Sequence, residues 1–262
     1  MPFCGAMAGH YAITIAHHTL LEAARNRLLW IAVAMLAAAL GLAAFLHQVA
    51  ITEARQIEAT VVAAFLRLAA VFLVVAFVVT SMVRELNDKV LEIVLSHPVP
   101  RSSYLLGKFV GFSSVAVVLA AFFALPLLLF APLARVLAWG GSLALELVIM
   151  TAVSLFCVLT LNQVVAALAA AAGFYILSRS IAAAQIIAAG GAHSATWSDR
   201  IADGTLDAIA MLLPSLDRMT RSDWLVSAGF EWQQLGGLAA MGVVYVMLIV
   251  AAALFDFHRK NF

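Results

Sequence analysis

The chain alternates long apolar runs with short polar segments, and the lengths of these runs predict helices that cross a membrane. A helix needs about 20 predominantly apolar residues to cross the hydrocarbon core of a bilayer. Six runs meet this requirement, which predicts an all-α integral membrane protein with six transmembrane helices in one transmembrane domain. The predicted spans are Leu28–Leu46, Val61–Val83, Tyr104–Leu133, Ser142–Leu161, Val164–Ala189 and Leu235–Phe255.

Local signals refine three of these spans. Arg25 and Arg27 precede the first run, as in a signal peptide, but that run is longer than a signal h-region, so we interpret it as an uncleaved span. Pro132 predicts that the third span kinks or ends near it. Only Asn162 and Gln163 separate the fourth and fifth spans, which therefore form an antiparallel hairpin.

Composition agrees with a membrane protein and excludes some functions. Hydrophobic residues make up 65% of the chain and charged residues 11%, against about 45–50% and 25% in soluble domains. The net charge of +1 argues against a nucleic-acid partner. Cys4 and Cys157 are isolated in the sequence, so no disulfide framework is indicated.

The distribution of arginine and lysine predicts the orientation. With six spans, both termini lie on one side, and the positive-inside rule places that side in the cytoplasm. The basic residues predicted on this side are Arg25, Arg27, Arg84, Lys89, Arg101, Lys108, Arg259 and Lys260. The opposite side holds Arg55, Arg135, Arg200, Arg218 and Arg221.

Three segments outside the spans have a character of their own. Residues 11–27 mix apolar and charged positions, which predicts an N-terminal interfacial elbow helix along the cytoplasmic face. Residues 190–234 form a large outward segment that contains aspartates and three tryptophans. Residues 84–96 form the third segment, and they give the clearest indication of function.

The segment 84–96 has the periodicity of an amphipathic helix. Leu86, Val90 and Ile93 share one face, and Glu85, Asp88 and Glu92 share another. Pro98 and Pro100 then stop the helix. A plain solvated loop is the simpler interpretation, but an apolar helix face on a short connection suits docking into a groove of a soluble partner.

The same region resembles the signature of type-two ABC exporter permeases. Those proteins carry an arginine-glutamate pair, a leucine-rich stretch ending in serine-x-proline, and then arginine, an aromatic residue and glycine-lysine. Here the matching strings are MVRE at residues 82–85, KVLEIVLSHP at 89–98 and PRSSYLLGK at 100–108. The layout of elbow helix, six spans, outward segment before the last span and basic tail is also similar.

This resemblance implies a membrane subunit that works with other chains. It implies two copies of an ABC ATPase subunit, a second permease copy or a related permease, and surrounding membrane lipids, in the bacterial cytoplasmic (inner) membrane. It implies that 84–96 is the coupling helix, and that export or flipping of a substrate uses ATP and Mg bound by the partner. The residues implied in coupling are Arg84, Glu85, Leu86, Asp88, Lys89, Glu92 and Ile93.

The sequence gives this chain no catalytic role of its own. It contains no glycine-rich phosphate-binding loop, because Gly107-Lys108 lacks the upstream glycine and is followed by Phe109. We therefore expect no cofactor on this chain and no enzyme activity from it alone. The histidines are dispersed or adjacent, so they indicate no metal site, and no spacing indicates a nucleophile.

Three charged residues inside the spans are candidates for a translocation path. Arg67, Glu146 and Arg179 all lie in the outer half under the predicted topology, where they could pair or extend to the headgroups. Two other classes of protein remain open. An ion-gradient-driven secondary transporter would favour an inverted repeat and charges at the midplane, and a membrane enzyme would use Glu146 or the histidines. The substrate is not indicated by the sequence.

Overall fold

All the structural elements described in this protein are helices. The computed structural model describes residues 14–23, 25, 27–49, 54–88, 101–190, 204–205, 214, 216 and 232–259. Residues 14–23 form an N-terminal helix. The longer elements are α2 (Leu28–Val49), α3 (Ala54–Asn87), α5 (Arg101–Ala124), the 3-10 helix η1 (Leu125–Leu129), α6 (Leu133–Leu161), α7 (Val164–Gly190) and α11 (Trp232–Arg259).

Six helices within the described residues are long and apolar enough to cross a membrane, as predicted. Helix α3 has 34 residues, which at about 1.5 Å per residue makes it about 51 Å long. The hydrocarbon core of a bilayer is only about 30 Å thick. The predicted second span, Val61–Val83, thus covers the middle of a helix whose two ends extend beyond it.

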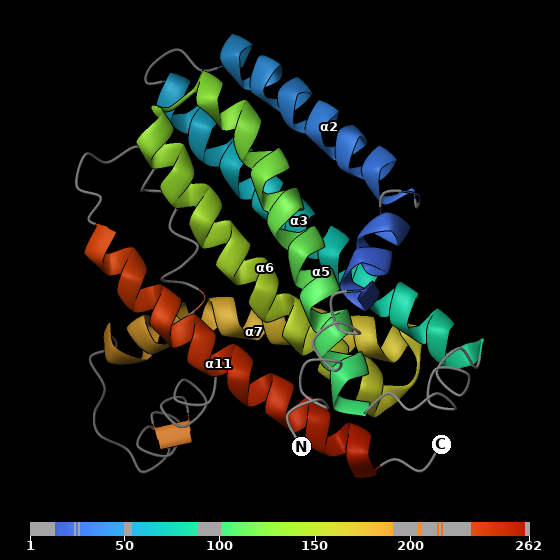
Figure 1. The fold of residues 1–262 in the computed structure, drawn as a ribbon. Helices are drawn as coiled ribbons and strands as arrows, with labels where there is room; N and C mark the ends of the chain where they lie inside the picture. The colour runs from blue at the N-terminus through green and yellow to red at the C-terminus, as the bar shows by residue number, and fades with distance from the viewer. Residues whose placement is uncertain are drawn as a thin grey trace.

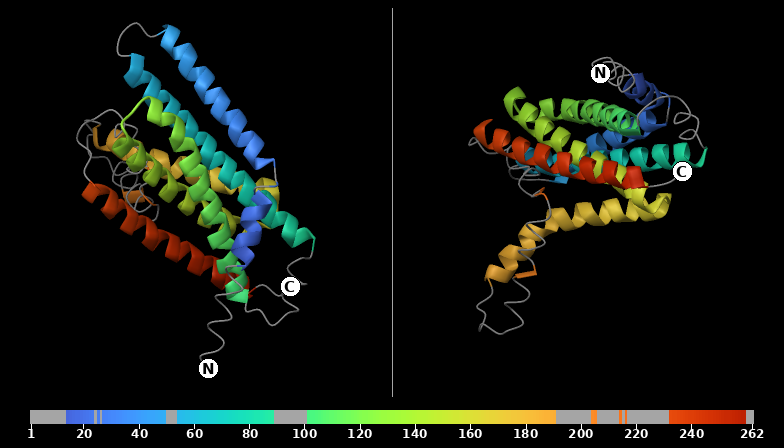
Figure 2. Two further views of the ribbon diagram at one scale, coloured as in Figure 1. Left: turned by 45° about the horizontal axis from the view of Figure 1, so that its top comes forward. Right: turned by 60° about the horizontal axis from the view of Figure 1, so that its bottom comes forward.

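Helices α3, α5 and α6 form the centre of the bundle. Helix α6 packs against α3, α5, α7 and α11, whereas α2 packs mainly against α3. Helix α7 lies at an angle to the others, on one side of the bundle (Figure 1; Figure 2). Half or more of the spans of α3, α5 and α6 is buried inside the protein, whereas α2, α7 and α11 are mostly exposed, as expected for helices that face lipid.

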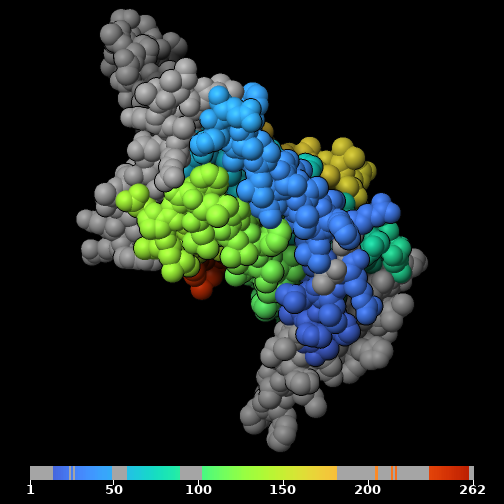
Figure 3. Space-filling model, turned by 90° about the horizontal axis from the view of Figure 1, so that it is seen from above, coloured from blue at the N-terminus to red at the C-terminus, as the bar shows by residue number. Residues whose placement is uncertain are grey.

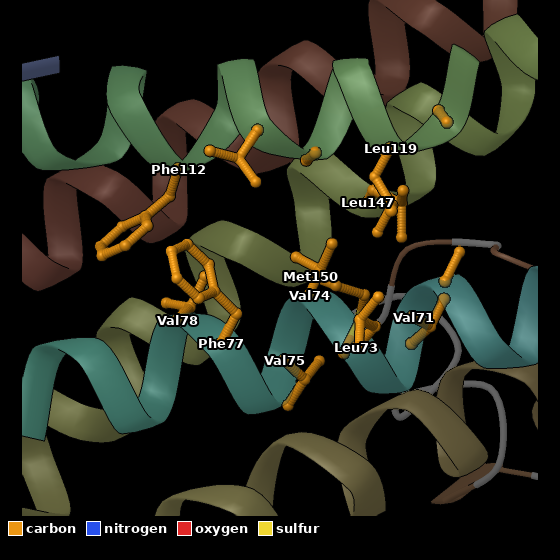
Figure 4. Packing of buried hydrophobic residues seen from close by; sticks show 14 of the residues in the cluster. Val71, Leu73, Val74, Val75, Phe77, Val78, Phe112, Leu119, Leu147 and Met150 are labelled. Atoms are coloured by element: carbon orange, nitrogen blue, oxygen red, sulfur yellow. The ribbon is translucent and has the colours of Figure 1, made fainter. Parts of the chain in front are cut away.

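Interlocking apolar side chains hold the central helices together. Phe77 of α3 meets Phe112 of α5 edge to face, with ring centroids 5.7 Å apart (Figure 4). Leu147 and Met150 of α6 are fully buried in the same cluster. Since lipid tails are as apolar as these side chains, van der Waals packing between helices supplies the stabilisation here.

Proline determines where the third span ends. Helix α5 stops at Ala124, and η1 follows with Pro126 in its first turn, where the missing backbone N–H is tolerated. Pro132 then caps α6 in an extended conformation. The expected break near Pro132 is confirmed. Helix α6 begins at Leu133 rather than at Ser142, because the glycine pair before Ser142 continues the helix instead of ending it.

A two-residue turn joins α6 to α7, as the sequence predicts. Asn162 has a φ of 54° in the left-handed region, and its backbone N–H bonds the carbonyl of Val158. Asparagine tolerates this conformation better than most residues, so it suits the C-terminal end of a helix. The turn makes α6 and α7 neighbours along the chain and in space.

The N-terminal helix packs on the rest of the bundle at one end. Figure 3 shows its dark-blue surface at one end of the blue surface of α2, beside the green surface of α5. Thr19 and Ala23 on this helix are buried. A Cβ added to Gly111 of α5 would lie 2.8 Å from the Cβ of Thr19. The position of the predicted elbow helix relative to a membrane stays a prediction.

Candidate functional site

Glu85 near the end of α3 is bonded to two side chains near the start of α5. The Tyr104 hydroxyl donates to Oε2 of Glu85 at 2.6 Å, and the Lys108 ammonium forms an ion pair with Oε1. The side chain of Glu85 is 14% exposed and that of Lys108 is 9% exposed. Glu85, Tyr104 and Lys108, here called the Glu85 cluster, therefore join the two helices in a largely dry environment.

Aromatic rings support the Glu85 cluster from two sides. The Tyr104 ring stacks on Phe257 of α11 at 6.5 Å between centroids. The Lys108 ammonium lies 5.6 Å from the centre of the Phe112 ring, within the range of a cation–π contact. Lys108 lies buried inside the bundle, where Glu85 provides its counterion.

Glu22 makes a second polar link at the same end. Its Oε1 accepts hydrogen bonds from Ser81 at 2.8 Å and from Arg84 at 2.6 Å. Ser81 is buried, whereas the Arg84 side chain is 62% exposed. The N-terminal helix is thus bonded through Glu22 to the last turns of α3, and it contacts α5 at Gly111.

The residues expected to form a coupling helix divide into two groups. Arg84 to Asn87 complete α3 instead of beginning a separate helix, and Asp88 follows as an exposed turn. Leu86 packs against the apolar core. Glu85 faces Lys108 and Tyr104, so it lies against its own chain. The remaining residues expected in coupling, Lys89, Glu92 and Ile93, lie outside the described residues.

The three charges expected inside the spans meet at one place. Nη1 of Arg67 donates to Oε2 of Glu146 at 2.6 Å, and Nη2 donates to the Ser142 hydroxyl at 3.0 Å. Both Arg67 and Glu146 are fully buried. The Arg67 guanidinium also lies 5.0 Å from the Trp139 ring centre. The pair joins α3 to α6, which excludes simple extension of either side chain to the headgroups.

Arg179 on α7 joins this group through Tyr175. Its Nη1 donates to the Tyr175 hydroxyl at 2.8 Å, and Tyr175 interacts electrostatically with both Arg179 and Glu146. Within the described part of the chain, Oε1 of Glu146 has no hydrogen-bond partner. Arg67, Glu146, Tyr175 and Arg179, here called the buried junction, connect α3, α6 and α7.

The polar pair of His47 and Glu58 was not predicted from the sequence. Nδ1 of His47 lies 2.8 Å from Oε1 of Glu58, where α2 and α3 meet at the end of the bundle opposite Glu85. Glu58 is buried, whereas the His47 side chain is 72% exposed. A glutamate one turn before a long apolar run was the available signal, but the predicted span began only at Val61.

Neither a metal site among the described residues nor a similarity to a known protein indicates the function. No group of three His, Cys, Asp or Glu residues in the described ranges is arranged to hold a metal ion. The chain matches no protein-family model and no curated protein sequence.

Proposed function

We propose that this chain is the permease subunit of an ATP-binding-cassette exporter, with ATP hydrolysed by a separate subunit. The observation that carries the proposal is the Glu85 cluster. Glu85 precedes the segment 89–100, and Tyr104 and Lys108 follow it, so bonds across the bundle fix the two ends of this segment relative to each other. A partner pushing on the segment would move α3 and α5 together.

The polar surface beside this segment supports contact with a soluble partner. Arg84 and Asp88 are exposed next to it, and Glu22 holds Arg84 in place. The sequence lacks a phosphate-binding loop, so a partner must supply the ATPase activity. Under this proposal, the Glu85 end of the bundle and both termini face the cytoplasm of a bacterial cell.

Transport would proceed by alternating access between two paired permease chains. ATP binding closes the two ATPase subunits on each other, and the segment after α3 moves with them. The Glu85 cluster carries this movement into α3 and α5, and the buried junction carries it from α3 to α6 and α7. Because chemistry and transport are separated, no residue of this chain is assigned a catalytic role.

Co-purification tests the proposed partnership. The tagged chain is expressed with a candidate ABC ATPase subunit from the same genome, and the two are expected to elute as one complex. Replacing residues 89–96 by a Gly/Ser linker of the same length should abolish the complex. The matched control replaces residues 50–53, which join α2 to α3 at the other end, and should leave the complex intact.

Two results would contradict the proposal. One is co-purification that survives the 89–96 replacement. The other is substrate movement driven by an ion gradient with no ATPase present, which would favour a secondary transporter. Arg67 and Glu146 neutralise each other in the buried junction, so this position offers no open ion site for a secondary transporter.

A further inference from the structure

An open apolar groove runs between α3 and α7. Its volume is about 630 Å³, and α6 contributes Met150 to its floor. Phe72 and Val75 form part of the α3 wall, and Leu168 and Ala172 form part of the α7 wall. Small alanine side chains on α7 leave this space between the two helices, and the lining is almost wholly apolar.

A positive charge lies just beyond one end of the groove. Tyr175 lines the groove, and Arg179 lies one turn further along α7 with Nη1 bonded to the Tyr175 hydroxyl. The Arg179 guanidinium also lies 5.9 Å from the Tyr175 ring centre. These contacts hold the Arg179 guanidinium near one end of the apolar groove.

Among the described residues, the one carboxylate of the buried junction is paired with Arg67 and not with Arg179. Arg67 and Glu146 neutralise each other at 2.6 Å. Within the described part of the chain, no carboxylate forms an ion pair with Arg179, and Nη1 of Arg179 donates to the neutral Tyr175 hydroxyl. A cation at membrane depth is costly without a partner of opposite charge, so this position favours an anion.

The groove has the length of one lipid chain. Its α7 wall runs from Val165 to Ile176, which at about 1.5 Å per residue is about 17 Å. Half of a hydrocarbon core of about 30 Å is about 15 Å. A chain lying along this wall therefore spans about one leaflet.

We propose that the groove between α3 and α7 binds one anionic lipid, with an acyl chain along the apolar lining and the charged headgroup on Arg179. The guanidinium fork forms paired hydrogen bonds with a phosphate better than with any neutral group. A second copy of this chain could cover the apolar walls, but an apolar helix would leave the Arg179 charge unmatched. This inference does not depend on the proposed ATPase partner.

Lipid binding to the isolated chain tests this site. The purified chain in neutral detergent is titrated with short-chain phosphatidylglycerol or phosphatidylcholine, and native mass spectrometry counts the lipids retained. The wild-type chain should retain one phosphatidylglycerol with a preference of about tenfold or more, the size of one charge-assisted contact. Arg179→Gln should reduce the preference to about twofold or less.

Two pairs of variants make the result specific to the groove. Ala172→Phe fills the groove from an exposed position and should remove the bound lipid, whereas Ala170→Phe, on the same helix outside the lining, should not. Arg135→Gln removes one positive charge elsewhere on the bundle and should keep the preference. If Arg179→Gln does not fold, the comparison of Ala172→Phe with Ala170→Phe still decides whether the lipid binds in the groove.

Three outcomes would overturn the proposal. One is equal retention of the two lipids by the wild-type chain. Another is a loss of preference in Arg135→Gln as large as that in Arg179→Gln, which would indicate a diffuse surface effect. The third is a lipid-free dimer that Ala172→Phe disrupts, which would assign the groove to a second copy of the chain.

Discussion

Nη1 of Arg67 lies 2.6 Å from Oε2 of Glu146, and neither side chain reaches the surface of the bundle. Burying two charges costs several kcal/mol per ion, and their mutual attraction offsets this cost only while both are present. The pair therefore makes the association of α3 with α6 depend on each partner. It also explains how two charges are tolerated within an apolar bundle.

Removing one member of this pair should destabilise the protein more than removing both. Glu146→Leu or Arg67→Met leaves one buried charge unpaired and should cost about 3–5 kcal/mol of unfolding free energy. The double variant should recover most of that loss. Chemical unfolding in mixed micelles measures all three, and single variants as stable as the wild type would contradict the assignment.

Gly111 should be intolerant of any side chain. An added Cβ would lie 2.8 Å from the Thr19 Cβ and 3.0 Å from the Ala16 backbone, so Gly111→Ala should cost about 1–3 kcal/mol through overpacking. Gly41→Ala is the matched control, because nothing lies within 4 Å of its added Cβ. Thermal unfolding compares the two, and equal midpoints would show that the N-terminal helix does not pack closely here.

Substituting Glu85 should destabilise the protein more than substituting its neighbour Arg84. Glu85→Gln leaves the nearly buried Lys108 without its counterion and should cost about 2–4 kcal/mol. Arg84→Gln removes an exposed ion pair and should cost less than about 1 kcal/mol. Unfolding of the two variants is compared in the same detergent. Similar costs would mean that the Glu85 cluster does not anchor the two helices.

Ser178 should anchor Pro214 and Leu216 to α7. Its buried hydroxyl donates to the carbonyl of Pro214 at 2.6 Å, and Leu216 nearby is buried in the core. Ser178→Ala removes one of two hydrogen bonds to this carbonyl, which also accepts the Leu216 backbone N–H at 2.8 Å, and should cost about 1 kcal/mol. Limited trypsin digestion at Arg218 or Arg221 should be faster in this variant than in Ser180→Ala, whose exposed hydroxyl contacts only its own helix.

The lengths of the apolar runs predict the number and order of the helices, because each run has at least about the 20 residues that crossing a bilayer requires. The helix bounds were less predictable. Helix α3 continues through polar residues at both ends, where Glu58 is bonded to His47 and Glu85 to Lys108. Such partners lie far away in the sequence, so a local pattern of hydrophobic and polar residues contains no signal for them.

The candidate site was predictable only as a set of residues. The motif at 82–108 contains Glu85, Tyr104 and Lys108, but their mutual bonds depend on how α3 and α5 pack. The sequence does not show that Lys108 lies buried beside Glu85, because this depends on the packing of the two helices. The sequence left the pairing of Arg67 with Glu146 open beside extension to the headgroups, and it gave no indication of the link through Tyr175, which depends on how α7 packs.

ATP hydrolysis in proteoliposomes is the measurement that tests the proposed function most directly. The partner ATPase is assayed alone, with the wild-type chain, and with the chain whose residues 89–96 are replaced by a linker. Coupling through the ends held by Glu85 predicts that the wild-type chain changes the hydrolysis rate in a substrate-dependent way and that the linker chain does not. Equal rates in all three samples would contradict the proposed coupling.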